Sequence, residues 1–253
     1  MSPLLRALSA ETIKLRGTLA LWMCLIAPAV VVGLYVMQLL VSRMGDMKPG
    51  DPTAAWTLFA QACLALWCFL MLPLFVTLEA ALLAGLEHNE RQWKHLLALP
   101  VPRRVHYLAK FAALTGLLLL AMAAFFVLIP LGGAVVMWLK PAFGLAGLPP
   151  WGFLMQKFAA IFAAALLIVA IHTWISIRWR SFTVAVATGM TATVMGFLIG
   201  QSEKFGHYFP WTMPLQVMAS GEKHLAFALV ASTIGAVVVT ALGLWDFLRR
   251  EVA

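Results

Sequence analysis

Six long apolar stretches, separated by short polar segments, constrain this chain more than any other feature of its sequence. A helix that crosses the hydrocarbon core of a bilayer needs about 20 apolar residues, because each residue adds about 1.5 Å along the axis. The six stretches cover about residues 19–41, 54–86, 105–139, 151–177, 182–199 and 224–244. The pattern predicts an all-α, polytopic membrane protein with six transmembrane helices.

The composition leaves little material for anything outside the membrane. The chain has 253 residues, of which 63% are hydrophobic and 11% charged, whereas a soluble domain carries about 25% charged residues. We therefore expect residues 1–253 to form a single transmembrane domain without a soluble catalytic domain. Three cysteines lie inside apolar stretches, where reduced side chains pack as small hydrophobes: Cys24, Cys63 and Cys68.

The basic residues predict the orientation. The net charge is +8, and cytoplasmic loops of membrane proteins are enriched in Lys and Arg. Twelve of the 18 Lys and Arg residues fall on the side of the predicted topology that holds both termini. This side is therefore expected to be cytoplasmic. The excess positive charge is explained by topology, and we expect no nucleic-acid partner.

Two overlong spans and one loop carry further expectations. The spans at 54–86 and 105–139 exceed one crossing and predict tilt, with Pro130 and Gly132-Gly133 as a kink or break. The external segment 201–221 is rich in aromatic and polar residues. It is consistent with a re-entrant lid or, as we expect, an ordered loop with aromatic anchors.

The N-terminal segment 2–17 has the pattern of an amphipathic helix. Its apolar residues recur at helical spacing on one face, as in Leu4, Leu8 and Leu15. Such a helix lies in the membrane interface rather than across it. Glu11 and Lys14 are three residues apart and can form an ion pair on this helix.

The polar loop 87–104 is the segment with the clearest functional pattern. Trp93, Leu96 and Leu97 form a small apolar face at positions i, i+3 and i+4. Charged residues surround that face: Glu87, Glu90, Arg91 and Lys94. The pattern predicts a short amphipathic helix, ended by Pro100 and Pro102. It fits either a helix that docks into a groove of a soluble partner or one that rests on lipid headgroups.

A family resemblance favours the first alternative. The loop ends in Leu97-Ala98-Leu99-Pro100-Val101-Pro102-Arg103, followed by Tyr107 and Lys110, and an interfacial helix precedes the first span. With six spans and cytoplasmic ends, the chain resembles the permease subunit of an ABC-2-type exporter. It is similar to bacterial permeases of peptide-antibiotic and lantibiotic self-resistance.

The resemblance implies a function and a set of partners. The loop would be the cytoplasmic coupling helix that docks on a dimeric ATP-binding subunit, through Glu87, Glu90, Arg91, Trp93, Lys94, Leu96 and Leu97. The sequence has no GxxxxGK[ST] fingerprint, so ATP and Mg²⁺ would bind that separate ATPase chain. A second copy or a related permease would complete the complex in the bacterial inner membrane. The substrate would be hydrophobic or amphipathic: a peptide antibiotic, a drug or a lipid-like molecule.

Two ionisable residues within the spans support competing interpretations. Glu79 and His172 lie at similar depths in the second and fourth spans, and such residues are costly in hydrocarbon. They are consistent with a gating or proton-sensing pair. The interpretation that we favour is local packing, with each side chain satisfied by its neighbours.

Two other classes of function compete with the permease. An ion-coupled secondary transporter could use Glu79. An intramembrane enzyme is the weaker alternative, because HExxH and paired aspartates are missing from the sequence, and His88 and His95 lack a third metal ligand. We therefore expect no metal and no cofactor in this chain.

Overall fold

A computed structural model describes residues 3–41, 51–89, 101–179, 181–218 and 222–249. All regular elements in these ranges are helical. They are α1 (Pro3–Leu15), α2 (Leu19–Val41), α3 (Pro52–Leu66), η1 (Trp67–Met71), α4 (Leu72–Asn89), α6 (Arg103–Leu139), η2 (Pro141–Phe143), α7 (Trp151–Arg178), α8 (Phe182–Gly200), η3 (Gly206–Tyr208), η4 (Pro210–Thr212), α9 (Met213–Gln216) and α10 (Glu222–Arg249).

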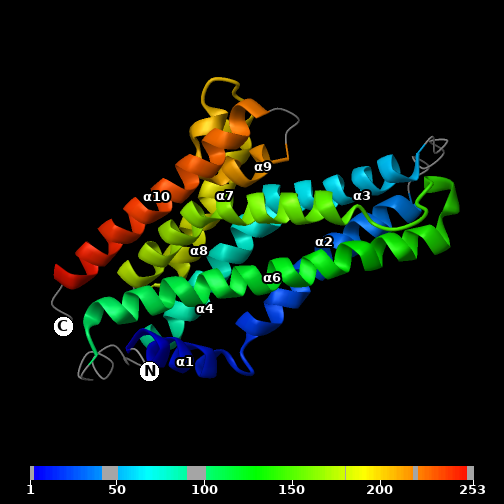
Figure 1. Cartoon of the computed structure of the whole chain (residues 1–253). Coiled ribbons are helices and arrows are strands. Elements are labelled where there is room, and N and C mark those ends of the chain that lie inside the picture. Colours follow the sequence, from blue (N-terminus) through cyan, green and yellow to red (C-terminus); the bar gives the residue numbers. More distant parts are fainter. Residues whose placement is uncertain (1–2, 42–50, 90–100, 180, 219–221, 250–253) are drawn as a thin grey trace.

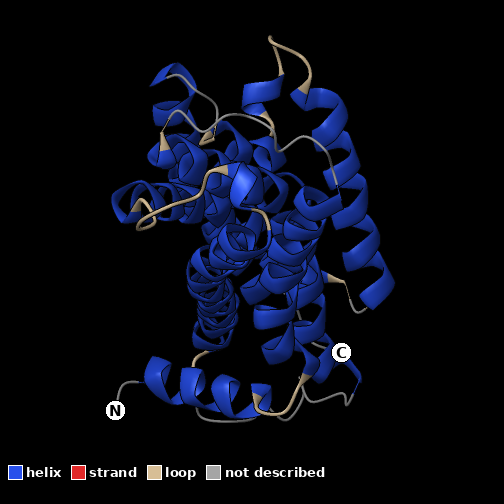
Figure 2. Cartoon of the chain, turned by 90° about the vertical axis from the view of Figure 1, so that its right-hand side faces the viewer, coloured by secondary structure: helices blue, strands red, loops and turns tan. Residues whose placement is uncertain are grey.

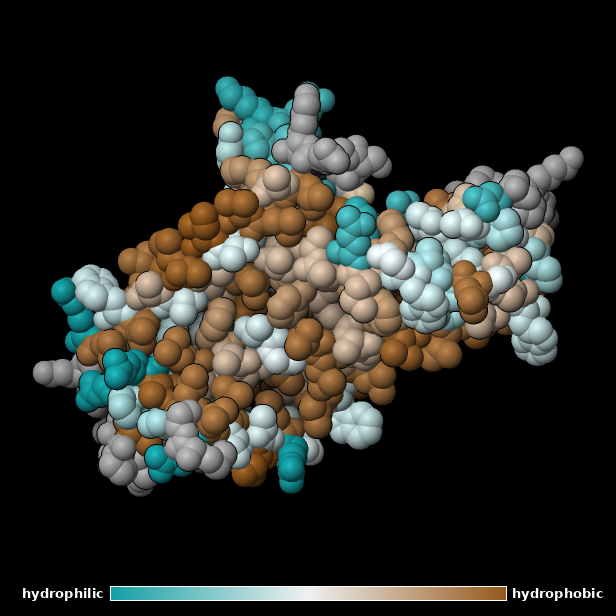
Figure 3. All heavy atoms as spheres, viewed as in Figure 1, coloured by the Kyte–Doolittle hydropathy of each residue, from teal (hydrophilic) through white to brown (hydrophobic). Residues whose placement is uncertain are grey.

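Six helical stretches are long and apolar enough to cross a bilayer, which confirms the predicted all-α, six-span architecture. They are α2, the continuous series α3–η1–α4, α6, α7, α8 and α10. In Figure 3 the middle of the molecule is covered by apolar residues, and hydrophilic residues gather toward its ends. This distribution fits a chain whose middle is solvated by lipid.

The two ends of the bundle differ. The terminal end carries α1 and the last turn of α10, and the segment 201–218 lies at the opposite, distal end, whereas the segment 140–150 lies at the right-hand tip of α3 and α6 (Figure 1). Helix α1 runs across the terminal end, roughly perpendicular to the neighbouring spans (Figure 2). It buries Glu11 and Leu15 against the bundle and leaves Leu5 and Ile13 exposed. This arrangement is the one expected of an interfacial helix.

The long second span contains a π-helical turn. Helix α3 passes through η1 into α4 without leaving the helical conformation. A π turn holds one extra residue, and such turns occur often at functional sites. The Trp67 side chain in this turn is fully buried, and its ring lies 5.0 Å from that of Phe125 on α6.

Helix α6 is continuous through the position where we expected a kink or break. The helix extends from Arg103 to Leu139 and includes Pro130. The two glycines that follow serve close packing instead. A Cβ atom at Gly132 would overlap Val32 of α2, and one at Gly133 would overlap the ring of Trp56 of α3. Small residues let helix backbones approach closely in membranes.

The distal segment 201–218 packs against the bundle through several buried side chains. Trp211, Met213 and Val217 are buried. Gly196, on α8, lies beside Trp211, and the Trp211 ring lies 5.7 Å from the ring of His172 on α7. The Lys157 ammonium on α7 donates to the Val217 carbonyl at 2.7 Å. The segment is therefore ordered and held to the bundle by buried side chains, Trp211 among them. Whether it is re-entrant in the membrane stays a prediction.

We predict that Gly133→Ala destabilises the protein by about 1–3 kcal/mol, because its methyl group overlaps the buried Trp56 ring. Thermal unfolding of the purified protein in detergent would measure the effect. Gly116→Ala in the same helix is the matched control, since no atom lies within 4 Å of its added Cβ. The control should be neutral or slightly stabilising, because Ala is the better helix former. Equal stability of the two variants would contradict the packing role of Gly133.

Candidate functional site

The predicted coupling segment connects α4 to α6 at the terminal end. Glu87 lies in the last turn of α4, which ends at Asn89. The other predicted contact residues lie outside the described residues: Glu90, Arg91, Trp93, Lys94, Leu96 and Leu97. Helix α6 begins directly after Pro102, whose fixed φ suits a helix start. The structure therefore defines the two helices that hold the segment.

A buried ion network joins these two helices to α1. The Lys110 ammonium on α6 contacts Glu11 Oε2 at 3.0 Å and donates to the Leu83 carbonyl of α4 at 2.9 Å. The Lys14 ammonium contacts Glu11 Oε1 at 3.0 Å, so the i, i+3 pair expected from the sequence is present. We call Glu11, Lys14, Lys110 and the Leu83 carbonyl the Glu11 network. It connects three helices within two turns of the coupling segment.

The electrostatics of the Glu11 network depend on its burial. The Lys110 side chain is 5% exposed and the Glu11 side chain 9% exposed. Desolvation by burial raises the pKa of Glu11, but the charges and hydrogen bonds of Lys110 and Lys14 outweigh it. The net effect is a pKa below the ordinary value of 4.5. The carboxylate is therefore ionised at neutral pH and holds both ammonium groups.

Lys110 is the member of this network whose role the sequence did not predict. It is a lysine near the start of a 37-residue apolar helix, which is itself a signal, because a charge at that position requires a partner. The sequence could not identify the partner, since Glu11 is 99 residues away.

A second polar contact at the terminal end joins α7 to α10. The Trp174 indole donates to Asp246 Oδ2 at 2.9 Å, and Arg178 Nε lies 3.8 Å from the same oxygen. The Arg178 side chain is 46% exposed, so this ion pair contributes at most about 1 kcal/mol. Together the two contacts hold the end of α10 against α7.

The structure does not bring Glu79 and His172 together as a pair. His172 Nε2 lies 3.1 Å from Thr77 Oγ1, and Thr77 also donates to the Pro73 carbonyl at 2.8 Å. Thr77 and Glu79 are two residues apart on α4, which places them about 200° apart around the helix. Glu79 therefore faces away from the side of α4 that contacts His172. His172 Nε2 thus has a local partner, as a packing role predicts, whereas His172 Nδ1 is buried with no hydrogen-bond partner among the described residues.

Glu79 differs from that expectation. Its side chain is fully buried, and neither carboxyl oxygen has a hydrogen-bond partner among the described residues. The carboxyl group is not bonded to a neighbouring serine or threonine. Within the described residues, no three His, Cys, Asp or Glu side chains gather as a metal site.

Comparison with known protein families shows which family the chain belongs to. The family model described as ABC-2 family transporter protein matches residues 7–200. These residues include most of α1, the first five spans and the segment between α4 and α6. The chain belongs to the ABC-2 transporter family. A search of curated proteins finds no match to it.

Membership confirms the resemblance to an ABC-2 permease, and the more specific likeness to antibiotic self-resistance permeases stays a prediction. ABC-2 permeases are transport subunits that work with an ATP-binding subunit. In this ABC-2 permease, the Glu11 network lies within the matched residues, between α1 and the helices that flank the predicted coupling segment.

We predict that Glu11→Gln destabilises this permease by about 3 kcal/mol, because it leaves the Lys110 charge buried without its counterion. The double variant Glu11→Gln/Lys110→Met should be less destabilised, since it removes both buried charges. Thermal unfolding in detergent measures both. Lys14→Gln is the control, because the Lys14 side chain is 26% exposed and its pair contributes at most about 1 kcal/mol. Additive losses would contradict the network.

The lowered pKa of Glu11 also sets a pH dependence. Its ionised form stabilises the fold, so this contribution is present above the ordinary carboxyl pKa of 4.5 and is lost as the pH falls below it. The difference in stability between wild type and Glu11→Gln should therefore be constant near neutral pH and shrink only in the more acidic range.

We predict that Glu79→Gln leaves stability nearly unchanged, whereas Glu79→Leu raises it by about 1–3 kcal/mol. The carboxyl group has no partner to lose, and the apolar side chain removes an unsatisfied buried polar group. Unfolding in detergent gives the measurement. Loss of stability in Glu79→Leu would indicate that the carboxyl group has a partner in the assembled protein.

Proposed function

We propose that this chain is the permease subunit of an ATP-driven ABC exporter. It moves a hydrophobic or amphipathic molecule, such as a peptide antibiotic, a drug or a lipid-like compound, across or out of the membrane. A dimer of a separate ATP-binding subunit, with ATP and Mg²⁺, supplies the energy. The match to the ABC-2 family over residues 7–200 carries this proposal.

The ATP-binding subunit docks on the coupling segment between α4 and α6. Trp93, Leu96 and Leu97 fill a groove of the ATPase, and the surrounding charges set the register. Closure of the ATPase dimer on ATP then pushes this segment. The push reaches α4 and α6 directly because both helices continue from it.

The Glu11 network distributes that push. Lys110 binds α6 to α1 through Glu11 and to α4 through the Leu83 carbonyl. A displacement of either flanking helix therefore acts on α1 at the membrane surface. On the other side of α4, the contact between Thr77 and His172 passes the same displacement to α7. These contacts support a movement of several helices together rather than of one loop.

The proposed orientation puts the terminal end in the cytoplasm of a bacterium, with the protein in the inner membrane. Four arginines lie in the first or last helical turns at this end: Arg103 and Arg104 at the start of α6, Arg178 at the end of α7 and Arg249 at the end of α10. Such residues favour the cytoplasmic side. A second permease, either a copy of this chain or a related one, encloses the path together with the first.

One observation favours a second candidate function. An intramembrane carboxyl group without a partner, as at Glu79, is a feature of ion-coupled transporters. In such a transporter, Glu79→Gln abolishes transport in cells with folding unchanged. In the ABC exporter, the same variant transports normally.

We predict that tagged wild-type protein, purified gently in detergent, retains a soluble ATPase, and that Trp93→Ala/Leu97→Ala loses most of it. Removing two apolar anchors of a small docking helix costs about 2–4 kcal/mol, more than a tenfold loss of affinity. Mass spectrometry of the co-purified proteins measures the ratio of ATPase to permease.

Trp138→Ala is the matched control for this experiment. Trp138 is 81% exposed near the opposite end of α6, so its loss should leave the ATPase bound. A wild-type preparation that retains other membrane assemblies but contains no ATPase would overturn the proposed function in favour of the transporter that uses Glu79.

A further inference from the structure

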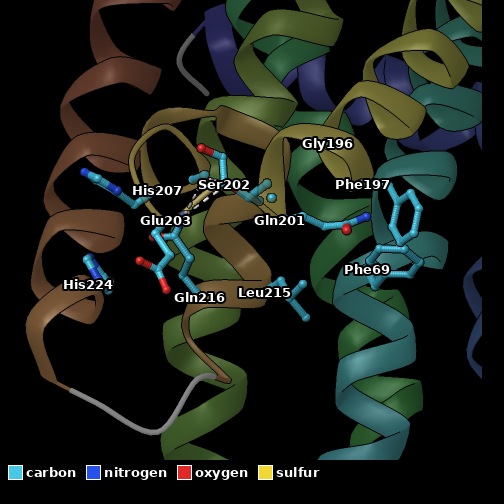
Figure 4. A pocket seen from close by; sticks show the side chains of 13 residues that line it. Phe69, Gly196, Phe197, Gln201, Ser202, Glu203, His207, Leu215, Gln216 and His224 are labelled. Atoms are coloured by element: carbon cyan, nitrogen blue, oxygen red, sulfur yellow. Dashed lines mark hydrogen bonds between the residues drawn. The ribbon is translucent and has the colours of Figure 1, made fainter.

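A pocket opens at the distal end, where η1, the last turn of α8 and the segment 201–218 meet. Its volume is about 420 Å³, within the range of small-molecule sites. Polar side chains, among them Glu203, His207 and Gln216, lie on one side of it. Phe69 and Phe197 lie on the other (Figure 4). The coupling segment and the Glu11 network lie at the opposite end of the bundle.

Gln216 fixes an unpaired hydrogen-bond acceptor in the wall of this pocket. Its Nε2 donates to the Gly206 carbonyl at 3.2 Å and to Thr212 Oγ1 at 3.0 Å, which uses both amide hydrogens. The opposite amide orientation would direct an oxygen at the Gly206 carbonyl, so the assignment follows from the contacts. Gln216 Oε1 is then buried without a partner among the described residues, and it contributes a partial negative charge beside the pocket.

The charged residues around the pocket also favour a positively charged ligand. Glu203 is exposed beside it, and no lysine or arginine lines it within the described residues. The nearby Lys204 lies with its ammonium 5.5 Å above the Phe205 ring and is not part of the wall. His207 and His224 stack with their ring centroids 5.1 Å apart, and His207 Nδ1 is buried with no hydrogen-bond partner in the part of the chain that the structure describes. The polar wall therefore combines a carboxylate with unpaired buried atoms.

The opposite wall suits an apolar body with a positive charge near it. Phe69 and Phe197 form an edge-to-face pair with centroids 5.4 Å apart. Aromatic faces attract ammonium groups as well as apolar groups. Phe69 belongs to the π-helical turn η1. The extra residue of that turn changes the direction of the side chains that follow it.

We propose that this distal pocket binds an amphipathic cation: a molecule with an ammonium group on an apolar body. The ammonium group bonds to the Glu203 carboxylate, close to the partial negative charge of Gln216 Oε1, and the apolar body packs on Phe69, Phe197 and Leu215. That such molecules are the transported class rests on the proposed function. The binding site itself requires only the permease and can be tested without an ATPase.

Three probes with one apolar body and different head groups test the proposal: 4-phenylbutylamine, 4-phenylbutanol and 4-phenylbutyrate. Calorimetric titration into the full chain in lipid nanodiscs, with empty nanodiscs subtracted, gives the affinities. The amine should bind about tenfold more tightly than the alcohol, because its hydrogen bonds are charge-assisted. The anion should bind most weakly.

Variants separate the contacts. Glu203→Gln should weaken the amine about tenfold and leave the alcohol nearly unchanged, since only the charge is lost. Phe197→Leu keeps the apolar volume but removes the aromatic face, and should weaken the amine about two- to fivefold. Asp51→Asn is the matched control. It removes an exposed negative charge near the start of α3, away from the pocket, and Asn also caps helices.

The outcomes discriminate clearly. Equal affinity of the three probes, or tightest binding of the anion, would overturn the proposal. So would equal effects of Glu203→Gln and Asp51→Asn, because a general surface charge would then account for the preference. If the amine binds as expected while no ATPase co-purifies, the result supports the cation site and overturns the proposed ABC exporter function. If the ATPase co-purifies but the amine does not bind, the exporter stands and the cation site fails.

Discussion

The hydrocarbon of a bilayer offers no hydrogen-bond partner, and this constraint shapes every polar group in the structure. Backbone groups are satisfied within helices, and several buried polar side chains find a partner on a neighbouring helix. Lys110 binds Glu11 and the Leu83 carbonyl, Ser232 donates to the Ala164 carbonyl, and Thr77 lies against His172. In each case a polar residue fixes two helices in one relative position. The positions of these pairs therefore determine which helices move together.

The helices themselves could be predicted from the sequence because length and hydropathy are local properties. The stretch 19–41 needs only its apolar composition to become a span, and α1 needs only its helical periodicity. The Glu11–Lys14 pair is equally local, since both residues lie on one turn. At Gly132 and Gly133 the expected break is wrong, because α6 is unbroken there, and the two glycines permit contact with α2 and α3. The sequence does not say which helix a glycine will face.

The other features that the sequence did not predict depend on contacts between residues that are distant in the chain. Glu79 and His172 have similar depths, which suggested a pair, but depth does not fix the angle around a helix. The angle between Thr77 and Glu79 decides that His172 contacts the former. The burial of segment 201–218 is likewise a tertiary property, because Trp211 and Val217 reach partners on α7 and α8. The acceptor at Gln216 exists only because Gly206 and Thr212 use both of its amide hydrogens.

The Glu11 network also has a consequence for biogenesis. Glu11 and Lys110 are 99 residues apart, so the ribosome must complete the first two spans and begin the third before the ion pair can form. Until then α1 has no binding site in the bundle, and its amphipathic face holds it at the lipid surface. The arrival of Lys110 then gives α1 a fixed position, so α1 is locked in place only after the two spans that follow it have been made.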